Sequence, residues 1–308
     1  MQGIDLAEAW YKKYLLPALE EELPGILNHC AVGIAGRGSE CFGFDDDVSR
    51  DHDFNPKASI WLTPEDDQLY GFKLIRLYNR VCKESGTSVE TQSSLLGDSE
   101  KTVEVIDDFL LRHLGYSHVP ETWQQWFYTP EYAFAEVLNG RIFRDDSGRF
   151  SAIRREIASA MPHDVRLKKL AARAVMMAQS GQYNFERCLK HNEPGAAALA
   201  LTEFVRNTVS MVFLLNNSFA PYYKWQFRAM RQLPKLSFLA GELENLLINE
   251  STTAGKSAAI HRICSAVIAE LAAQKLSAAQ DDYLEPHAFE LTRQITNQEI
   301  RALHIMEG

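Results

Sequence analysis

The sequence predicts an α+β protein in which an N-terminal domain with a small mixed sheet and helices, residues 1–145, precedes an all-helical bundle, residues 146–308. Apolar runs of strand length, rich in small and β-branched residues, occur only in the first half, at 29–35, 58–63 and 102–106. In the second half, apolar residues recur at helical spacing, and Pro or Gly separates long segments. A chain of 308 residues is long enough to build a core in each of two domains.

The N-terminal domain is expected to begin with an amphipathic helix over 5–22, because Trp10 and Leu15 share one face with other apolar residues. Pro24 and Gly25 end this helix. The elements expected after it are a strand from His29 to Ala35, a second strand that begins near Asp51 and resumes at 58–63, a helix over 65–83, a loop over 85–100, a strand over 102–106, helices over 108–114 and 131–138, and a turn over 144–148.

The C-terminal half is expected to contain helices only, since strand-like runs disappear from it after residue 151. The sequence has no internal repeat and no low-complexity tail. The expected helical segments, separated by Pro, Gly or polar turns, are 151–160, 164–180, 183–191, 195–216, 222–232, 236–249, 255–274 and 282–298.

The net charge and the cysteine content argue against several classes of protein. The net charge of −9 argues against a general nucleic-acid-binding surface, because Lys and Arg supply most contacts to phosphate backbones. The five cysteines lack any C-x-x-C pair, which indicates reduced thiols rather than disulfides or a zinc site. The N-terminus lacks the basic start and apolar run of a signal peptide, and no apolar run is judged long enough to span a bilayer. We therefore expect a cytoplasmic protein without a membrane partner.

One stretch combines a glycine turn with paired acids. The apolar run 30–35 leads into the turn Gly36–Glu40, whose glycines let a ligand approach the backbone closely. Asp51 and Asp53 then stand at the start of a strand-like run, and the two-residue period of a strand puts both on one face. Such a pair repels by roughly 1 kcal/mol in bulk water and about 4 kcal/mol at an effective dielectric constant of about 20. A cation offsets this cost, and oxygen ligands beside a phosphate-sized turn indicate Mg²⁺ carrying a nucleoside triphosphate.

The same residues carry a resemblance to a known family. A hydrophobic strand, then Gly38-Ser39, then the Asp51-His52-Asp53 run at the start of a strand resembles the signature of the DNA polymerase β-like nucleotidyltransferase superfamily. The helical half is similar in layout to aminoglycoside nucleotidyltransferases. The whole chain looks most like bacterial nucleotidyltransferase-fold proteins with a helical C-terminal domain. The resemblance implies a polymerase β-like domain over residues 1–145.

The resemblance also implies roles for individual residues. The backbone N–H groups of Gly38 and Ser39, with the serine hydroxyl, would hold the β- and γ-phosphates. Asp51 and Asp53 would ligate Mg²⁺. The family adds a third carboxylate from a later strand, which binds metal or acts as general base, and Glu104 within the expected strand 102–106 is the favoured candidate.

Two further residues of the N-terminal half can each be interpreted in two ways. Asp107 is the other candidate for the third carboxylate, but it can equally cap the helix that follows. Arg37 stands between two glycines of the turn, where it either steers phosphate or is simply an exposed arginine.

The helical half supplies candidates for the other wall of the nucleotide site. In the resembling enzymes a Lys and a Tyr of the helical domain point toward the triphosphate, and Lys224 and Tyr223 fit these roles, although they also fit a helix start packed on the bundle. Arg187, Lys190 and His191 lie on adjacent turns of one helix and form a basic cluster that can meet phosphates or an anionic substrate.

The leading hypothesis is a Mg²⁺-dependent nucleotidyltransferase that moves a nucleoside monophosphate from ATP or another NTP to an acceptor hydroxyl. The acceptor is a small molecule such as an aminoglycoside, a protein or an RNA end. The alternatives are a Mg·NTP-binding regulatory or antitoxin-like module without catalysis, and a helical-domain ribonuclease that uses Arg187 and His191.

Overall fold

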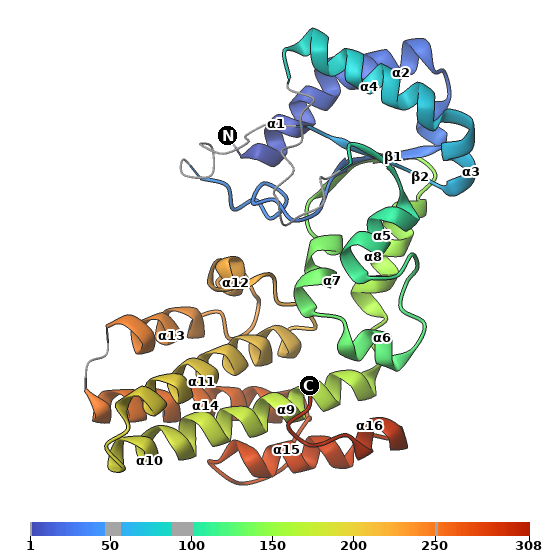
Figure 1. The fold of residues 1–308 in the computed structure, drawn as a ribbon. Coiled ribbons are helices and arrows are strands. Elements are labelled where there is room, and N and C mark those ends of the chain that lie inside the picture. Colours follow the sequence, from blue (N-terminus) through green and yellow to red (C-terminus); the bar gives the residue numbers. More distant parts are fainter. Residues whose placement is uncertain (1, 47–56, 88–100, 250–251) are drawn as a thin grey trace. The chain divides into compact units, whose positions relative to one another are not determined.

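The computed structural model describes residues 2–46, 57–87, 101–249 and 252–308, and its chain divides into two compact units (Figure 1). The chain passes between the units three times: unit 1 comprises Met1–Glu121 and Ala133–Ala160, and unit 2 comprises Thr122–Tyr132 and Met161–Gly308. This division differs from the expected boundary at residue 145, because helix α8 (Arg149–Ser159) belongs to unit 1 and helix α6 (Trp123–Tyr128) to unit 2.

Unit 1 is built on a four-stranded mixed sheet with the strand order β3-β2-β1-β4. Strand β1 pairs antiparallel with β2 and β4, whereas β2 and β3 run parallel. The α+β class and the small mixed sheet predicted from the sequence are therefore confirmed. The strands are β1 (Cys30–Ile34), β2 (Ser59–Leu62), β3 (Val103–Val105) and β4 (Arg141–Asp145).

Strand β4 was not predicted, because a turn was expected over 144–148. Its side chains include two arginines and an aspartate that stay exposed or half-buried, so it lacks the apolar signal of a buried strand. Its place in the sheet depends on tertiary pairing with β1, which shifts register between Val32 and Gly33. A turn does follow, at 146–147.

Helices flank this sheet in unit 1. The expected helix over 5–22 is confirmed as three helical segments in direct succession, α1, a π-helical η1, and α2, whose buried face includes Trp10, Leu15 and Leu19. The helical segments of unit 1 are α1 (Gly3–Trp10), η1 (Tyr11–Leu15), α2 (Leu16–Glu22), η2 (Ile26–Asn28), α3 (Pro64–Asp66), η4 (Asp67–Gly71), α4 (Phe72–Ser85), α5 (Ile106–Leu114), most of α7 (Glu131–Leu138) and α8.

The main core of unit 1 lies between the sheet and the helices α1, α2 and α4. All five residues of β1 are buried, as the small and β-branched composition of this run predicts. Val32 and Ile60 of neighbouring strands pack with Trp10 and Tyr78 from the helices. This core holds the end of β1, where the glycine turn begins, on a buried strand.

Unit 2 is all-helical in its described residues, and the prediction of helices alone after residue 151 is confirmed. Helices α9 and α11 form its centre, with α10, α14 and α15 packed around them (Figure 1). Besides α6, the helical segments are α9 (His163–Met177), η5 (Ala178–Asn184), α10 (Phe185–Lys190), α11 (Pro194–Leu215), α12 (Tyr223–Met230), α13 (Leu239–Ile248), α14 (Thr253–Ala273), α15 (Leu284–Arg293) and α16 (Gln298–Ala302).

By length and composition, helix α11 is long and apolar enough to cross a membrane. From the sequence, no apolar run was expected to be long enough to do so. In the structure 61% of its most apolar window is buried against the other helices of unit 2. A central helix of a helical bundle is apolar for this reason, because neighbouring helices surround it.

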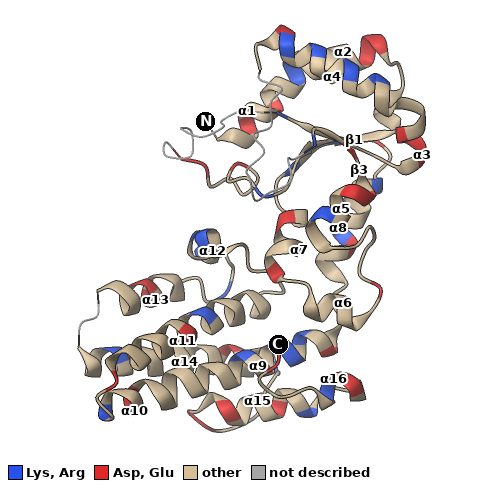
Figure 2. Cartoon of the chain, in the orientation of Figure 1, with Lys and Arg blue, Asp and Glu red and all other residues tan. Residues whose placement is uncertain are grey.

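Charged residues of both signs are spread over the helices of each unit (Figure 2). Several of them form ion pairs within or between helices, such as Arg80 with Glu22 and Arg262 with Glu242.

Candidate functional site

The turn after β1 begins at Gly36, whose backbone has a φ of 129°, in the region that favours glycine. The side chain of Asn139 binds both backbone groups of this residue. The Gly36 N–H donates to Asn139 Oδ1 at 2.9 Å, and Asn139 Nδ2 donates to the Gly36 carbonyl at 2.6 Å. Asn139 follows α7, so the turn is held by a residue about one hundred positions away in the chain.

The next residues of the turn present backbone donors. The carbonyl of Gly38 accepts a hydrogen bond from Cys41, and that of Ser39 accepts from Phe42 and Phe44. By contrast, the N–H groups of Gly38 and Ser39 donate to no acceptor in the part of the chain that the structure describes. Both residues are half-buried rather than enclosed. Two successive unpaired N–H groups at a glycine turn suit an anion such as a phosphate.

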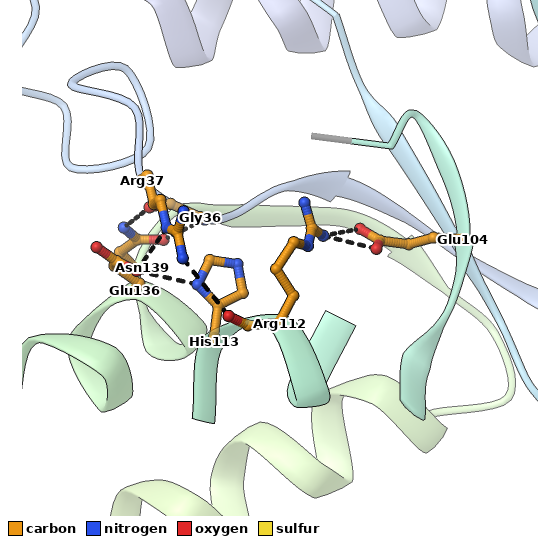
Figure 3. A network of polar contacts seen from close by, with 7 residues as sticks. All are labelled: Gly36, Arg37, Glu104, Arg112, His113, Glu136 and Asn139. Atoms are coloured by element: carbon orange, nitrogen blue, oxygen red, sulfur yellow. Dashed lines mark hydrogen bonds and ion pairs between the residues drawn. The ribbon is translucent and has the colours of Figure 1, made fainter. Parts of the chain in front are cut away.

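Arg37 connects this turn to two helices of unit 1 (Figure 3). Its Nε lies 3.5 Å from Glu136 Oε2, and its Nη2 donates to the carbonyl of Arg112 at 3.5 Å. Glu136 is buried on α7, and His113 Nδ1 of α5 lies 3.0 Å from the same oxygen. The Nε2 atom of His113 is buried and has no hydrogen-bond partner among the described residues. Arg37, an exposed residue, is thereby oriented by a buried pair.

Glu104 lies in β3, beside Trp61 of β2, and is 5% exposed. Both oxygens of its carboxylate accept hydrogen bonds from Arg112 Nη2 at 2.6 Å (Figure 3). The Nη1 atom of Arg112 is buried, and within the described part of the chain it has no hydrogen-bond partner. Glu104 is therefore held by a cation in this structure, which compensates for the burial of its charge.

The two acids predicted to bind metal, Asp51 and Asp53, lie outside the described residues. Among the described residues, no group of three His, Cys, Asp or Glu side chains is arranged to hold a metal ion. The expectation that Asp107 caps the next helix was wrong: the N-cap of α5 is Val105, and Asp107 stands in the first helical turn. There its charge is favourable because it lies near the positive end of the helix dipole.

Unit 2 contains a pocket of about 840 Å³, and every residue that lines it belongs to this unit. It lies between the α6–α7 connection, α9, α11 and the start of α12. A volume in this range is typical of small-molecule sites. The lining residues are Phe127, Tyr128, Thr129, Pro130, Glu131, Tyr132, Lys169, Arg173, Glu203, Arg206, Asn207, Ser210, Ala220, Pro221, Tyr222, Tyr223, Gln226, Glu307 and Gly308.

Two cations of α9 lie on the pocket wall, one helical turn apart. Lys169 is 4% exposed, and burial lowers the pKa of its ammonium, an effect that Glu131 opposes. Burial also lowers the pKa of Arg173. Arg173 Nη1 donates to Asn207 Oδ1 at 2.9 Å and its Nη2 donates to the carbonyl of Gly308.

The carboxylates of the pocket are already hydrogen-bonded. Glu131 accepts from the Ser210 hydroxyl at 3.1 Å and from the Ala220 N–H at 3.4 Å. Glu203 accepts from Asn207 Nδ2 at 2.8 Å and pairs with Arg206 at 3.4 Å.

The residues predicted in the helical half are not brought together at this pocket. Tyr223 lines it, whereas Lys224 is exposed and lies over the Trp225 ring at 5.0 Å. Arg187 and Lys190 on α10 do not line it: Arg187 donates to the Tyr183 hydroxyl at 2.6 Å, and Lys190 lies 3.7 Å from Glu186.

Sequence reasoning missed Lys169 and Arg173. The available signal was their position at i and i+4 within a helix whose other residues are largely apolar, Leu167 to Met177. Charged residues that share a face with core residues are candidates for a buried polar site.

A family model described as a domain of unknown function, DUF4037, matches residues 126–226, about a third of the chain. No curated protein and no solved structure matches the chain. The matched segment supplies every residue that lines the pocket except Glu307 and Gly308.

Proposed function

We propose that the chain is a nucleotidyltransferase of the cytoplasm that moves a nucleoside monophosphate from ATP or another NTP to an acceptor hydroxyl, with Mg²⁺ as cofactor. The observation that carries this proposal is the turn at Gly36–Ser39. It stands at the end of a buried strand, and the N–H groups of Gly38 and Ser39 are unpaired within the described residues. Such N–H groups can bind phosphate oxygens, as a backbone anion site does.

The arrangement around the turn supports this interpretation. Asn139 binds both backbone groups of Gly36 and so holds the turn in one conformation. Arg37, oriented by Glu136, adds a cation beside the unpaired N–H groups. A preorganised site binds charge without first having to reorganise, which is the main way an enzyme stabilises charge in a transition state.

The acids proposed to hold Mg²⁺ are Asp51, Asp53 and Glu104. Both oxygens of Glu104 accept hydrogen bonds from Arg112, and a carboxylate oxygen can accept a hydrogen bond and ligate a cation at the same time. When bound, Mg²⁺ would neutralise phosphate charge and polarise the phosphoryl oxygens.

The proposed reaction is an in-line displacement. The acceptor hydroxyl oxygen forms a bond to the α-phosphorus, the bond from the α-phosphorus to the bridging oxygen breaks, and pyrophosphate leaves with that oxygen. The hydroxyl proton passes to a carboxylate, for which Glu104 is the candidate. The Gly38 and Ser39 N–H groups hold the phosphates in place, and this positioning supplies most of the acceleration.

The test is transfer from NTPs labelled at the α-phosphate, in the presence of Mg²⁺, to three kinds of acceptor: an aminoglycoside, a short RNA with a free terminal hydroxyl, and the chain itself. We expect labelled product with one of them, released pyrophosphate, and loss of at least two orders of magnitude in rate for Asp51→Ala/Asp53→Ala.

The matched control is Glu20→Ala/Glu21→Ala, which removes two exposed carboxylates of α2. This variant should retain the wild-type rate. Equal turnover by the wild type and the Asp51→Ala/Asp53→Ala variant would refute the proposal.

A nucleotide-binding module without catalysis is the second candidate, and the Glu104–Arg112 pair favours it. A carboxylate whose two oxygens both accept from one guanidinium is already engaged within the protein. Glu104→Gln separates the two functions. For the enzyme we expect lost turnover with retained NTP binding, whereas a binding module would show no turnover in the wild type and unchanged NTP affinity in the variant.

A further inference from the structure

The pocket of unit 2 contains a buried cation that makes no hydrogen bond or ion pair with the described residues. Lys169 is 4% exposed and lines the pocket. Across the described residues, its ammonium makes neither a hydrogen bond nor an ion pair, and its one recorded contact with a ring is with the Phe127 face, 5.6 Å from the centroid. A buried charge of this kind is costly unless a partner is supplied.

Arg173 adds a second cation to this part of the pocket wall. It stands four residues after Lys169, so the two cations face the same side of α9. Two nitrogens of its guanidinium donate hydrogen bonds to Asn207 and Gly308, but the Nε atom is buried without a partner in the residues that the structure describes.

The carboxylates of the pocket do not remove the need for an acceptor. Glu131 accepts from Ser210 and Ala220, Glu203 is engaged by Asn207 and Arg206, and Glu307 accepts from the Tyr128 hydroxyl. Glu131 interacts electrostatically with Lys169, but none of these carboxylates accepts a hydrogen bond from its ammonium within the described residues. A bound carboxylate or phosphate supplies such an acceptor.

The aromatic side of the pocket indicates the rest of the ligand. Tyr132, Tyr222 and Tyr223 all line it and all remain exposed, at 42%, 44% and 69%. Tyr222 contacts both other rings, with centroids 5.9 Å from Tyr132 and 4.5 Å from Tyr223. Three exposed tyrosines linked through Tyr222 offer faces on which a flat ring can stack.

We infer that the pocket of unit 2 is a binding site for a small organic anion with a planar ring, its anionic group at Lys169 and its ring against the tyrosines. The shared chemistry is a carboxylate or phosphate attached to a ring system, as in an aromatic acid or a nucleoside monophosphate. The volume of about 840 Å³ accommodates either. The inference does not depend on nucleotidyl transfer, because every lining residue belongs to unit 2.

The test is isothermal titration calorimetry on the full chain with four probes: AMP, 4-hydroxybenzoate, adenosine and inorganic phosphate. The titrations contain a chelator, so that no divalent metal contributes. We expect one of the two ring-bearing anions to bind in the micromolar to millimolar range. Adenosine and inorganic phosphate, which each lack one half of the ligand, should bind at least tenfold more weakly. Binding of AMP would indicate a nucleoside monophosphate as the ligand, and binding of 4-hydroxybenzoate would indicate an aromatic acid.

Three variants locate the site. Lys169→Met keeps the length of the side chain and removes the charge, and should lower the affinity for the ring-bearing anion at least tenfold. Tyr222→Ala should lower it severalfold; as a change of an exposed side chain, it is the second readout if Lys169→Met does not fold. Lys235→Met removes an exposed lysine of unit 2 outside the pocket and should leave the affinity unchanged.

Three results would overturn the inference. The first is no binding of AMP or of 4-hydroxybenzoate up to millimolar concentration. The second is unchanged affinity in both Lys169→Met and Tyr222→Ala. The third is adenosine binding as tightly as AMP, because the anionic group would then contribute nothing.

Discussion

At the scale of single residues, Asn139 determines the conformation of the turn after β1, since its side chain both accepts from and donates to Gly36. Asn139→Asp replaces the donor by a second oxygen and places a carboxylate against the Gly36 carbonyl. We expect a loss of about 1–3 kcal/mol in the free energy of unfolding, as for a buried polar group left without its partner. Urea denaturation followed by circular dichroism measures the change.

The control is Asn28→Asp, an exposed asparagine of η2 whose side chain has no recorded contact in the described structure. Its free energy of unfolding should stay within about 0.5 kcal/mol of the wild type. If both variants unfold at the same urea concentration as the wild type, the two hydrogen bonds of Asn139 contribute nothing to stability.

Lys168 is the residue that holds the segment after α16. Its Nζ donates to the carbonyls of His304, Ile305 and Glu307 at 2.6, 3.3 and 2.8 Å, and the side chain is 1% exposed. Lys168→Met preserves the packing volume but removes all three hydrogen bonds. We expect a loss of roughly 2 kcal/mol, because bonds from a charged donor are worth more than neutral ones.

Hydrogen exchange measured by mass spectrometry tests this expectation locally. Amides near residues 304–308 should exchange faster in Lys168→Met, whereas those of β1 should be unchanged. Lys12→Met, at an exposed lysine paired only with Glu8, is the matched control and should alter neither region. Unchanged exchange near residues 304–308 in Lys168→Met would contradict the assigned role.

At the scale of elements, the pairing of β4 with β1 depends on two glycines at which the strands approach closely. A Cβ atom added at Gly140 would overlap the carbonyl oxygen of Ile34, and one at Gly33 would contact the backbone of Arg141 and Ile142. Gly140 also has a φ of 72°. We expect Gly140→Ala to lower the free energy of unfolding by at least 3 kcal/mol, the sum of left-handed strain of roughly 1–2 kcal/mol and a steric clash with backbone.

Gly148→Ala separates these two contributions. Gly148 has nearly the same φ, 68°, but an added Cβ would contact nothing within 4 Å. Gly148→Ala should therefore lower the free energy of unfolding only by the roughly 1–2 kcal/mol that left-handed strain costs. Chemical denaturation measures the free energy of unfolding of both variants. An equal decrease in both would show that β1 and β4 can move apart at Gly140 without loss of stability.

At the scale of the whole molecule, all five cysteines are free, and burial protects most of them. Burial raises the pKa of Cys30 and of Cys264 to about 12, and it also raises the pKa of Cys82. Cys41 is buried as well, whereas Cys188 is half-buried. Because the thiolate is the reactive form, a raised pKa reduces its fraction at neutral pH.

We expect one thiol, Cys188, to react rapidly with an aromatic disulfide reagent at about pH 8, and the other four only after unfolding. Labelling of the native chain, followed by peptide mass spectrometry, identifies the residue, and a sample in strong denaturant gives the total of five. A native Cys188→Ser variant should show no rapid phase. A rapid phase in that variant would contradict the buried placement of the other cysteines.

The class of the fold, and the order of its elements apart from β4 and α6, were determined by the sequence itself. The run 30–34 is small, β-branched and apolar, and forms a fully buried strand; the helix at 131–138 has the predicted bounds. The change from apolar runs of strand length to apolar residues at helical spacing predicted that the second half is helical. These features are local, so residues within a few positions of one another suffice to predict them. The glycine turn was also predicted from the sequence, because Gly36 adopts a backbone conformation that few other residues adopt.

Tertiary structure alone decided which residues meet. Asn139 reaches Gly36, Arg112 binds Glu104, and the strand at 141–145 pairs with β1, although its composition resembles a turn. The pocket of unit 2 likewise brings Lys169 together with tyrosines from two distant segments, and the spacing of Lys169 and Arg173 on α9 does not indicate which tyrosines they meet. The physical reason is common to all of these. The stability of a hydrogen bond, a strand pair or a buried charge depends on groups brought together by packing, whereas periodicity records only which face of an element is apolar.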